Sequence, residues 1–277
     1  MKVVLFCGGY GMRMRDGVTL APKPMAMIGH RPLIWHVMRY YAHYGHDDFV
    51  LCLGYGAEHV KEYFLRYDET SSNDFVFSEG GGKIELLSTD ISNWRITFVN
   101  TGLDTAIGER LRRVRRFVAD EEMFLANYAD VLTDAPLDDV VSRFSASNAV
   151  ASMLAVPPQS AFHCLTLGED GLVEQVQSVH NLPLWENGGY FVLRQGIFDV
   201  LPEGGDLVDD GCGTLARRGR LLAYPHKGFW HPADTLKERA KLEEMYHAGV
   251  RPWAPWEADM GPADGMSWAP DREAAER

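Results

Sequence analysis

The stretch FCGGYGMRMRDGVTLAPKPMAMIG, residues 6–29, directly follows a short run of apolar residues at positions 3–5. Such a continuous apolar run is typical of a strand that is buried on both faces of a sheet. Glycines directly behind a strand can adopt positive φ angles, and they let backbone N–H groups approach an anion closely. Their spacing matches neither the dinucleotide fingerprint GxGxxG nor the Walker pattern. The stretch therefore predicts a buried strand that leads into an anion-binding loop, without identifying the anion.

Segments typical of strands and helices alternate along the first half of the chain. Strands are predicted at residues 2–6, 49–53, 84–87, 96–99 and 123–128, and helices at residues 32–44, 57–66 and 108–118. This alternation predicts an α/β fold with a mostly parallel sheet and helices on both faces. Further strands are predicted at residues 150–156, 173–179, 190–193 and 221–224, with fewer helices between them. We therefore expect the sheet to continue, with a smaller β-rich lobe packed at its edge and a last helix at residues 233–248.

The bulk composition is that of a globular protein, with 46% hydrophobic and 24% charged residues. The net charge of −12 argues against nucleic acid as a partner, so a phosphate would have to be bound by a local basic pocket. No apolar stretch is long enough to span a bilayer, and Met1 leads directly into the first predicted strand rather than into a signal peptide. We expect a cytoplasmic protein without a membrane partner.

The four cysteines, Cys7, Cys52, Cys164 and Cys212, form no CxxC pair. Cys7 and Cys52 lie inside apolar runs that are predicted to be strands. We interpret the cysteines as buried free thiols of a reducing compartment, and this pattern disfavours a zinc site.

Three short motifs occur together near the start of the chain: GGYGMR at residues 8–13, PKPM at residues 22–25 and IG at residues 28–29. Together they resemble the signature of the sugar-1-phosphate nucleotidyltransferases, GGxGTRL followed by PKP. The likeness continues through RPLIWHVMRYYAHYG, DFVLCLGYG, TGLDTAIGERLRRV, ENGGYFVL, GFWHPADTL and PWAPWE. In this extended form the chain is most similar to the glucose-1-phosphate cytidylyltransferases, over roughly residues 1–257.

The resemblance implies a Rossmann-like nucleotidyltransferase sheet in a single domain, residues 1–257. The nucleotide-binding half would span about residues 1–135 and the acceptor-side half about residues 136–257. Residues 258–277 are rich in Ala, Gly, Asp, Glu and Pro, and we expect a disordered tail there. The implied reaction needs Mg²⁺: a phosphorylated acceptor such as glucose 1-phosphate attacks CTP, or another nucleoside triphosphate, and pyrophosphate is released.

Nucleotidyl transfer needs donors and cations placed in advance, because charge gathers on the α-phosphate and on the departing pyrophosphate. The backbone of the glycine loop can surround the phosphates, Arg13 can reach the β and γ groups, and Lys23 is a point charge between two prolines. On their own, Arg13 and Lys23 would be interpreted as solvated loop residues, but within this signature they are the candidate catalytic residues. The resemblance assigns nucleotide binding to Gly8, Gly9, Gly11, Met12, Arg13, Lys23 and Arg110, with Met12 replacing the usual threonine.

Two aspartates are the candidate metal ligands. Asp130 follows the strand predicted at residues 123–128, and a carboxylate at the carboxyl end of a parallel strand faces the crevice where ligands bind. Mg²⁺ prefers one or two carboxylates together with phosphate oxygens, so a second carboxylate is expected. Asp234 matches the other metal aspartate of the family. It could instead cap the following helix, but Thr235 and Glu238 form a capping box of their own.

The acceptor side departs from the family pattern. Leu182 stands where the family has a lysine that contacts the sugar phosphate, and an Arg-Phe-Gly element appears here as Ala161-Phe162-His163. His180 could supply the missing charge, although a lone histidine at a strand end is more often structural. Glu186, Asn187 and Gly188 still match a turn that can hydrogen-bond sugar hydroxyls. We therefore expect the acceptor to be glucose 1-phosphate or a related phosphorylated compound that suits the altered side chains. Alternatively, the chain is a non-catalytic nucleotide-binding regulatory or scaffold protein that has lost its acceptor site.

A homo-oligomer is also expected. The resembling family forms oligomers, and the aromatic, apolar segment WAPW at residues 253–256 is interpreted as a surface that needs burial.

Overall fold

The computed structural model describes residues 1–8, 22–159 and 162–258 of the chain. Among the predicted site residues, Gly9, Gly11, Met12 and Arg13 lie outside the described residues, as do Ala161 and the tail from residue 259 onward. The predictions made for them stay predictions.

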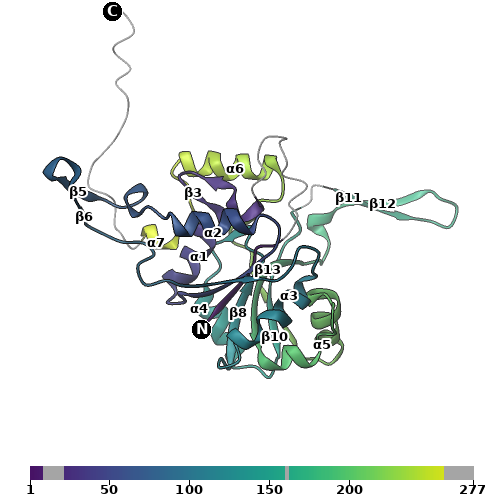
Figure 1. Ribbon diagram of the computed structural model, residues 1–277. Helices are drawn as coiled ribbons and strands as arrows, with labels where there is room; N and C mark the ends of the chain where they lie inside the picture. Colours follow the sequence, from purple (N-terminus) through teal and green to yellow (C-terminus); the bar gives the residue numbers. More distant parts are fainter. Residues whose placement is uncertain (9–21, 160–161, 259–277) are drawn as a thin grey trace, which may run out of the picture.

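A seven-stranded sheet forms the centre of the molecule (Figure 1). Its strands, in spatial order, are β14 (Leu221–Pro225), β10 (Ala151–Val156), β13 (Glu186–Arg194), β8 (Met123–Asn127), β1 (Val3–Phe6), β4 (Asp48–Leu53) and β7 (Arg95–Asn100). All neighbouring pairs are parallel except the two that β13 makes with β10 and β8. The prediction of a mostly parallel sheet that continues into the second half of the chain is confirmed.

The two faces of the sheet bury two separate apolar clusters. Along β1, Val3 and Leu5 point into one cluster and Val4 and Phe6 into the other, as expected for a strand buried on both faces. The first cluster is covered by α1 (Leu33–His43), α2 (Ala57–Leu65), α4 (Leu137–Ser145), α6 (Leu236–His247) and α7 (Pro255–Ala258). The second is covered by α3 (Ile107–Val114) and α5 (Gly213–Arg217). Helices therefore lie on both faces, as predicted.

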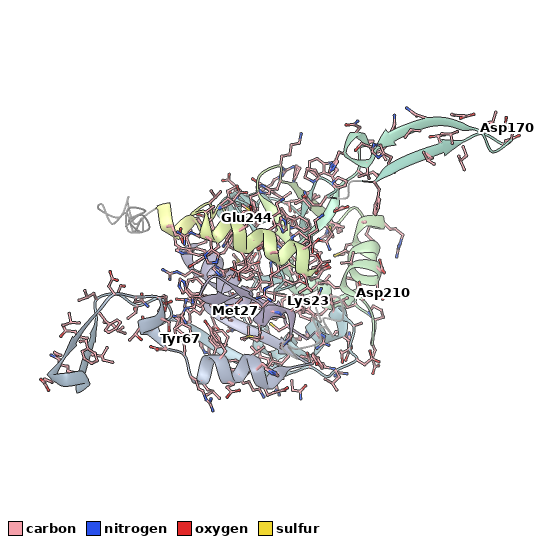
Figure 2. The ribbon with its side chains drawn as sticks, turned by 90° about the horizontal axis from the view of Figure 1, so that it is seen from above. Lys23, Met27, Tyr67, Asp170, Asp210 and Glu244 are labelled. Atoms are coloured by element: carbon pink, nitrogen blue, oxygen red, sulfur yellow. The ribbon has the colours of Figure 1, made fainter. Side chains whose placement is uncertain are left out.

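Two of the predicted strands belong to hairpins outside the central sheet. The run at residues 84–87 becomes β6 (Lys83–Leu86), which pairs with β5 (Phe75–Ser78), and the run at residues 173–179 becomes β12 (Val173–Ser178), which pairs with β11 (His163–Leu167). Both hairpins project from the body of the molecule in Figure 1, and Asp170 marks the tip of β11–β12 in Figure 2. A local sequence pattern predicts a strand but not its partner. The sequence therefore did not show whether these strands belong to the central sheet or to a separate hairpin.

Two very short strand pairs complete the fold: β2 (Met27–Ile28) with β3 (Arg31–Pro32), and β9 (Val131–Thr133) with β15 (Trp230–Pro232). Pro32 was predicted as the first helical residue of α1, but its ψ of 156° is extended, so it caps the helix instead. The difference follows from its pairing with Met27 in β2.

The segment WAPW lies against α1 of its own chain. Trp253 is 1% exposed and Trp256 9%, and their rings contact His36 and Trp35 respectively. The inference that this segment needs a partner subunit for burial was therefore wrong, because the first apolar cluster already covers it.

The cysteine prediction holds for three of the four residues. Cys7, Cys52 and Cys212 are buried, Cys164 is exposed on β11, and all four are free thiols. In the described part of the chain, no helix combines the length and the apolar character that a membrane crossing requires.

Candidate active site

The carboxyl ends of β1 and β8 bring two predicted site residues to the same edge of the sheet. The strands pair in parallel, Val3 opposite Leu125, so Gly8 and Asp130 both follow strand ends at this edge. Strand β13 runs in the opposite direction, so it begins at this edge with Glu186. Ligands of open α/β sheets bind at such carboxyl edges. The edge therefore combines Gly8, a carboxylate and the predicted acceptor turn.

Lys23 lies between the two predicted metal aspartates. Its Nζ atom is 2.6 Å from Oδ1 of Asp234 and 3.5 Å from Oδ2 of Asp130. Lys23 stands between Pro22 and Pro24 and is the first residue of a short 3₁₀ helix, Lys23–Met25. Lys23 lies in the body of the molecule beside α6 (Figure 2). The structure thus brings together three predicted site residues from distant parts of the sequence.

The environment of Asp130 disfavours an isolated negative charge. Burial raises the pKa of Asp130 to about 7; Lys23 opposes the rise, and the neighbouring Asp234 adds to it. A cation held between the two carboxylates removes this penalty.

The donor set fits Mg²⁺. Within the described ranges, no group of three or more His, Cys, Asp or Glu side chains could hold a metal ion together. Two carboxylates, completed by phosphate oxygens and water, are the set that Mg²⁺ prefers. Asp130 and Asp234 are therefore the residues that would hold it.

The helix that follows Asp234 does not use its carboxylate as a cap. Thr235 accepts a hydrogen bond from the Glu238 amide, and the Glu238 carboxylate accepts from the amides of Thr235 and Asp234. The predicted capping box is confirmed, and the Asp234 carboxylate points to Lys23 instead.

A short strand pair, which was not predicted from the sequence, joins the two aspartates. Strand β9 directly follows Asp130, and β15 pairs with it and ends two residues before Asp234. The Ala233 amide donates a hydrogen bond to the Asp130 carbonyl at 2.9 Å. Three-residue strands carry too little periodicity to be predicted from a single sequence. The only available signal was their position beside the two candidate aspartates.

Ala129, directly before Asp130, has a left-handed backbone conformation with φ of +62°. The Asn127 side chain accepts a hydrogen bond from the Ala129 amide at 2.6 Å, and this turn directs the chain from β8 to the candidate metal site. Residues with a side chain are uncommon in this region, and such strain concentrates at functional sites.

We expect Ala129→Val to lower the free energy of unfolding by about 2–4 kcal/mol, because a β-branched residue fits neither the positive φ nor the buried space. Ala129→Gly is expected to stay within about 1 kcal/mol of the wild type, since relief of strain is offset by lost burial and backbone entropy. Urea unfolding of both variants measures the difference. Equal stabilities would show that the conformation at Ala129 is not restrictive.

Arg110, on α3, lies behind the start of the glycine loop and is buried. Its guanidinium donates to the carbonyls of Gly8 at 3.1 Å and Leu53 at 3.3 Å, and to the Thr101 hydroxyl at 2.8 Å. A Cβ atom at Gly8 would lie 2.1 Å from a guanidinium nitrogen, so a larger residue here would displace Arg110 from these hydrogen bonds. Arg110 therefore fixes the strand end from which the loop departs, and its predicted contact with nucleotide stays a prediction.

The predicted acceptor turn is held by hydrogen bonds within the protein. The Asn187 side chain donates to the Tyr128 hydroxyl at 2.9 Å and accepts from the Gly189 amide at 3.0 Å. The Gly188 carbonyl accepts from the Trp230 indole at 2.8 Å. Glu186 is exposed, and its carboxylate accepts weakly from the Gln159 amide at 3.4 Å.

His180, considered as a substitute for the missing lysine, lies in the segment after β10, as does His163. His180 is exposed in a 3₁₀ helix, and its side chain makes no hydrogen bond or ion pair with any described residue. Leu182 caps that helix and is half-buried, while His163 is exposed at the start of β11. Among the described residues, no cationic side chain contacts the acceptor turn in place of the missing lysine.

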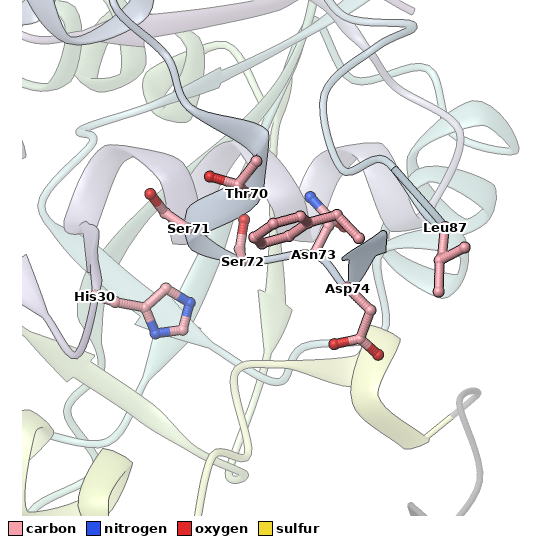
Figure 3. A pocket seen from close by; sticks show the side chains of 8 residues that line it. His30, Thr70, Ser71, Ser72, Asn73, Asp74 and Leu87 are labelled. Carbon is pink, nitrogen blue, oxygen red and sulfur yellow. The ribbon is translucent and has the colours of Figure 1, made fainter. Parts of the chain in front are cut away.

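A hollow lies near His30 and the segment at residues 70–75 (Figure 3), and none of the predicted site residues lines it. Several of its polar side chains are already engaged with neighbours: Thr70 with Asp68, Ser72 with Asp90, and Asn73 with Glu69. This hollow is therefore a weaker candidate than the carboxyl edge of the sheet.

Comparison with known proteins agrees with this geometry. Models of known protein families give no match. Among solved structures, an apo UDP-glucose pyrophosphorylase superposes with a TM-score of 0.66 at 18% identity, covering 90% of this chain and 99% of the other. HddC from Yersinia pseudotuberculosis, complexed with GMP-PN, gives a TM-score of 0.63 at 15% identity, covering 88% and 99%. The fold is that of the sugar-1-phosphate nucleotidyltransferases.

Relatives in sequence narrow the class. The chain is 36% identical over 258 residues to a Bacillus subtilis protein named as a probable glucose-1-phosphate cytidylyltransferase, covering 92% of this chain and all of the relative. It is 34% identical over 262 residues to the glucose-1-phosphate cytidylyltransferase of Salmonella typhimurium, covering 93% and again all of the relative. The chain belongs to the glucose-1-phosphate cytidylyltransferase family and is a nucleotidyltransferase. The resemblance inferred from the motifs is confirmed.

Proposed function

We propose that this protein transfers CMP from CTP to glucose 1-phosphate, or to a closely related phosphorylated acceptor. A phosphate oxygen of the acceptor attacks the α-phosphorus of CTP, a new P–O bond forms, and the bond to the leaving pyrophosphate breaks. The observation that carries this proposal is the convergence of Lys23, Asp130 and Asp234 at the carboxyl edge of the sheet. The Salmonella relatives, which the chain covers in full, are named for this activity.

Each residue has a role that follows from its position. Lys23 supplies a positive charge to the phosphates, while Asp130 and Asp234 would hold Mg²⁺, which when bound neutralises charge that develops during transfer. Arg110 keeps Gly8 in place, so that the loop predicted to bind the phosphates starts from a fixed strand end. Asn187 and Gly188 form a rigid turn that supports binding of the acceptor.

We further propose that residues 1–257 act as one catalytic domain. We also propose that the protein works in the cytoplasm, with nucleotides and sugar phosphates as its substrates. Lys23 comes from the first half of the chain and Asp234 from the second, and their side chains are in contact. The retained cluster of Lys23, Asp130 and Asp234 supports an active enzyme rather than a non-catalytic scaffold.

A grid of nucleoside triphosphates against phosphorylated acceptors, followed by pyrophosphate release, tests the proposed reaction. We expect CTP with glucose 1-phosphate or a related sugar phosphate to give the highest kcat/KM. The Asp130→Asn variant serves as the control for contaminating activity. A preference of tenfold or more for UTP, dTTP or ATP over CTP would contradict the proposal, as would a lack of turnover with every acceptor.

We also propose a homo-oligomer, now supported by the two projecting hairpins. Each presents an apolar cross-strand pair to solvent: Phe77 and Ile84 are 63% and 53% exposed, and Leu165 and Val176 are 55% and 59% exposed. Isolated two-stranded hairpins are marginally stable in water, so a second copy that covers these faces would stabilise them. Light scattering is expected to give a multiple of 31.1 kDa, and a monomer mass at micromolar concentration would contradict this.

A further inference from the structure

A buried histidine and an aspartate form a pair next to the short strands β9 and β15. The His226 Nε2 atom is 2.7 Å from Oδ1 of Asp134 and 3.3 Å from the Phe229 carbonyl oxygen. Because both partners are acceptors, Nε2 carries the hydrogen that is donated. His226 is 9% exposed and lies 92 residues from Asp134 in the sequence. Neither residue was among the predicted site residues.

The pair fixes the turn at residues 226–229, which leads into β15. A Cβ atom at Gly228 would lie 2.5 Å from the Asp134 carboxylate and 2.6 Å from the His226 ring, so the turn closes tightly around the pair. The Phe229 carbonyl also accepts from the Thr133 hydroxyl at 2.8 Å and from the Asp134 amide at 3.1 Å. The turn is thereby joined to the end of β9.

The same turn determines where two parts of the active site lie. Strand β15 begins at Trp230, whose indole donates to Gly188 in the acceptor turn, and it pairs with β9 as far as Pro232 opposite Val131. Directly after β15, the Ala233 amide donates a hydrogen bond to the Asp130 carbonyl, and Asp234 is the next residue. A shift of the turn along β9 would therefore move Asp234 relative to Asp130 and Trp230 relative to Gly188.

We propose that His226 and Asp134 are positioning residues, which set the separation of the two metal aspartates and the place of the acceptor turn. They are not catalytic residues: Asp134 is four residues from Asp130 along a strand, which is about 13 Å. They act through the backbone of β9 and β15. The inference rests on the proposed function, because it takes Asp130 and Asp234 as metal ligands and residues 186–188 as the acceptor turn.

Three variants separate positioning from folding. His226→Leu removes the hydrogen bond, whereas in His226→Gln the terminal amide replaces Nε2 as donor to Asp134. Gly228→Ala keeps both partners but forces them apart. His247→Leu is the matched control, because His247 forms a mostly exposed contact with Glu243 at 3.6 Å, far along α6.

The readouts are Mn²⁺ binding to the nucleotide-free protein by calorimetry, kcat and KM for the acceptor, and the melting temperature. We expect His226→Leu and Gly228→Ala to weaken Mn²⁺ binding and raise the acceptor KM by about tenfold each, as for residues that orient metal ligands. His226→Gln should stay within about threefold of the wild type, and His247→Leu should match it. Where His226→Leu does not fold, Gly228→Ala decides the question.

Unchanged Mn²⁺ affinity and acceptor KM in a folded His226→Leu or Gly228→Ala variant would overturn the positioning role. A lower melting temperature alone, with both constants unchanged, would overturn it as well, because it would show a purely structural pair. A wild type that binds Mn²⁺ but transfers no CMP would instead contradict the proposed function, and the Mn²⁺ measurements would still decide the role of the pair.

Discussion

Asp130→Asn is expected to reduce metal-dependent turnover by roughly a thousandfold or more, because it removes one of the two carboxylates that would hold Mg²⁺. The charge that develops on the phosphates would then be poorly neutralised. The variant should remain folded. Burial already raises the pKa of Asp130 to about 7, so a neutral amide of the same size suits this environment. Pyrophosphate release measures the loss, and circular dichroism with thermal melting verifies the fold.

Asp139→Asn is the appropriate control, since Asp139 is an exposed carboxylate in the first turn of α4. Its turnover should equal that of the wild type. Asp234→Asn should resemble Asp130→Asn in effect. Near-normal activity with Mg²⁺ in either active-site variant would remove that residue from the metal site.

Lys23→Met is expected to lower turnover by roughly a hundredfold to a thousandfold, as is typical when a positioned charge on the reacting phosphates is removed. A second effect should be opposite in sign. In the wild type the Lys23 ammonium contacts both carboxylates, so it competes with a divalent cation for them. Without it, Mg²⁺ alone should raise the melting temperature more strongly in the variant than in the wild type.

Thermal melting at increasing Mg²⁺ concentrations, without nucleotide, measures this second effect. Lys61→Met, an exposed lysine of α2, serves as the control and should behave like the wild type in both assays. A Lys23→Met variant with normal turnover, or with a smaller response to Mg²⁺ than the wild type, would show that Lys23 does not share the site with the metal.

The strands and helices of the sheet were predictable because their side chains follow a regular pattern. Strand β1 is apolar on both faces, and its neighbours β4 and β8 share this feature, so all three were located within one residue. The two aspartates became candidates for different reasons. Asp130 follows a buried strand, whereas Asp234 matches the second metal aspartate of the resembling family and adjoins a capping box that does not need its carboxylate.

Features that depend on distant residues were not predictable. The pairing of β9 with β15, the contact of His226 with Asp134 and the burial of Trp253 against α1 each join parts of the chain that no local pattern relates. The strand at β6 was predicted, but its pairing with β5 in a projecting hairpin was not. Arg110 was predicted to bind nucleotide, which stays a prediction, and its contact with the Gly8 carbonyl could be found only from the fold.

Lys23 and Asp234 lie 211 positions apart in the sequence, and this separation affects how the chain folds during its synthesis. During synthesis, Lys23 and Asp130 emerge long before Asp234, so a nascent chain cannot assemble this charge cluster until almost all of it has been translated. Contacts that close such long loops are costly in entropy and form late in folding. A substrate that binds only the completed cluster therefore stabilises the fully folded state by mass action. A chain cut before β15 lacks Asp234, so it would be inactive and would not gain this stabilisation.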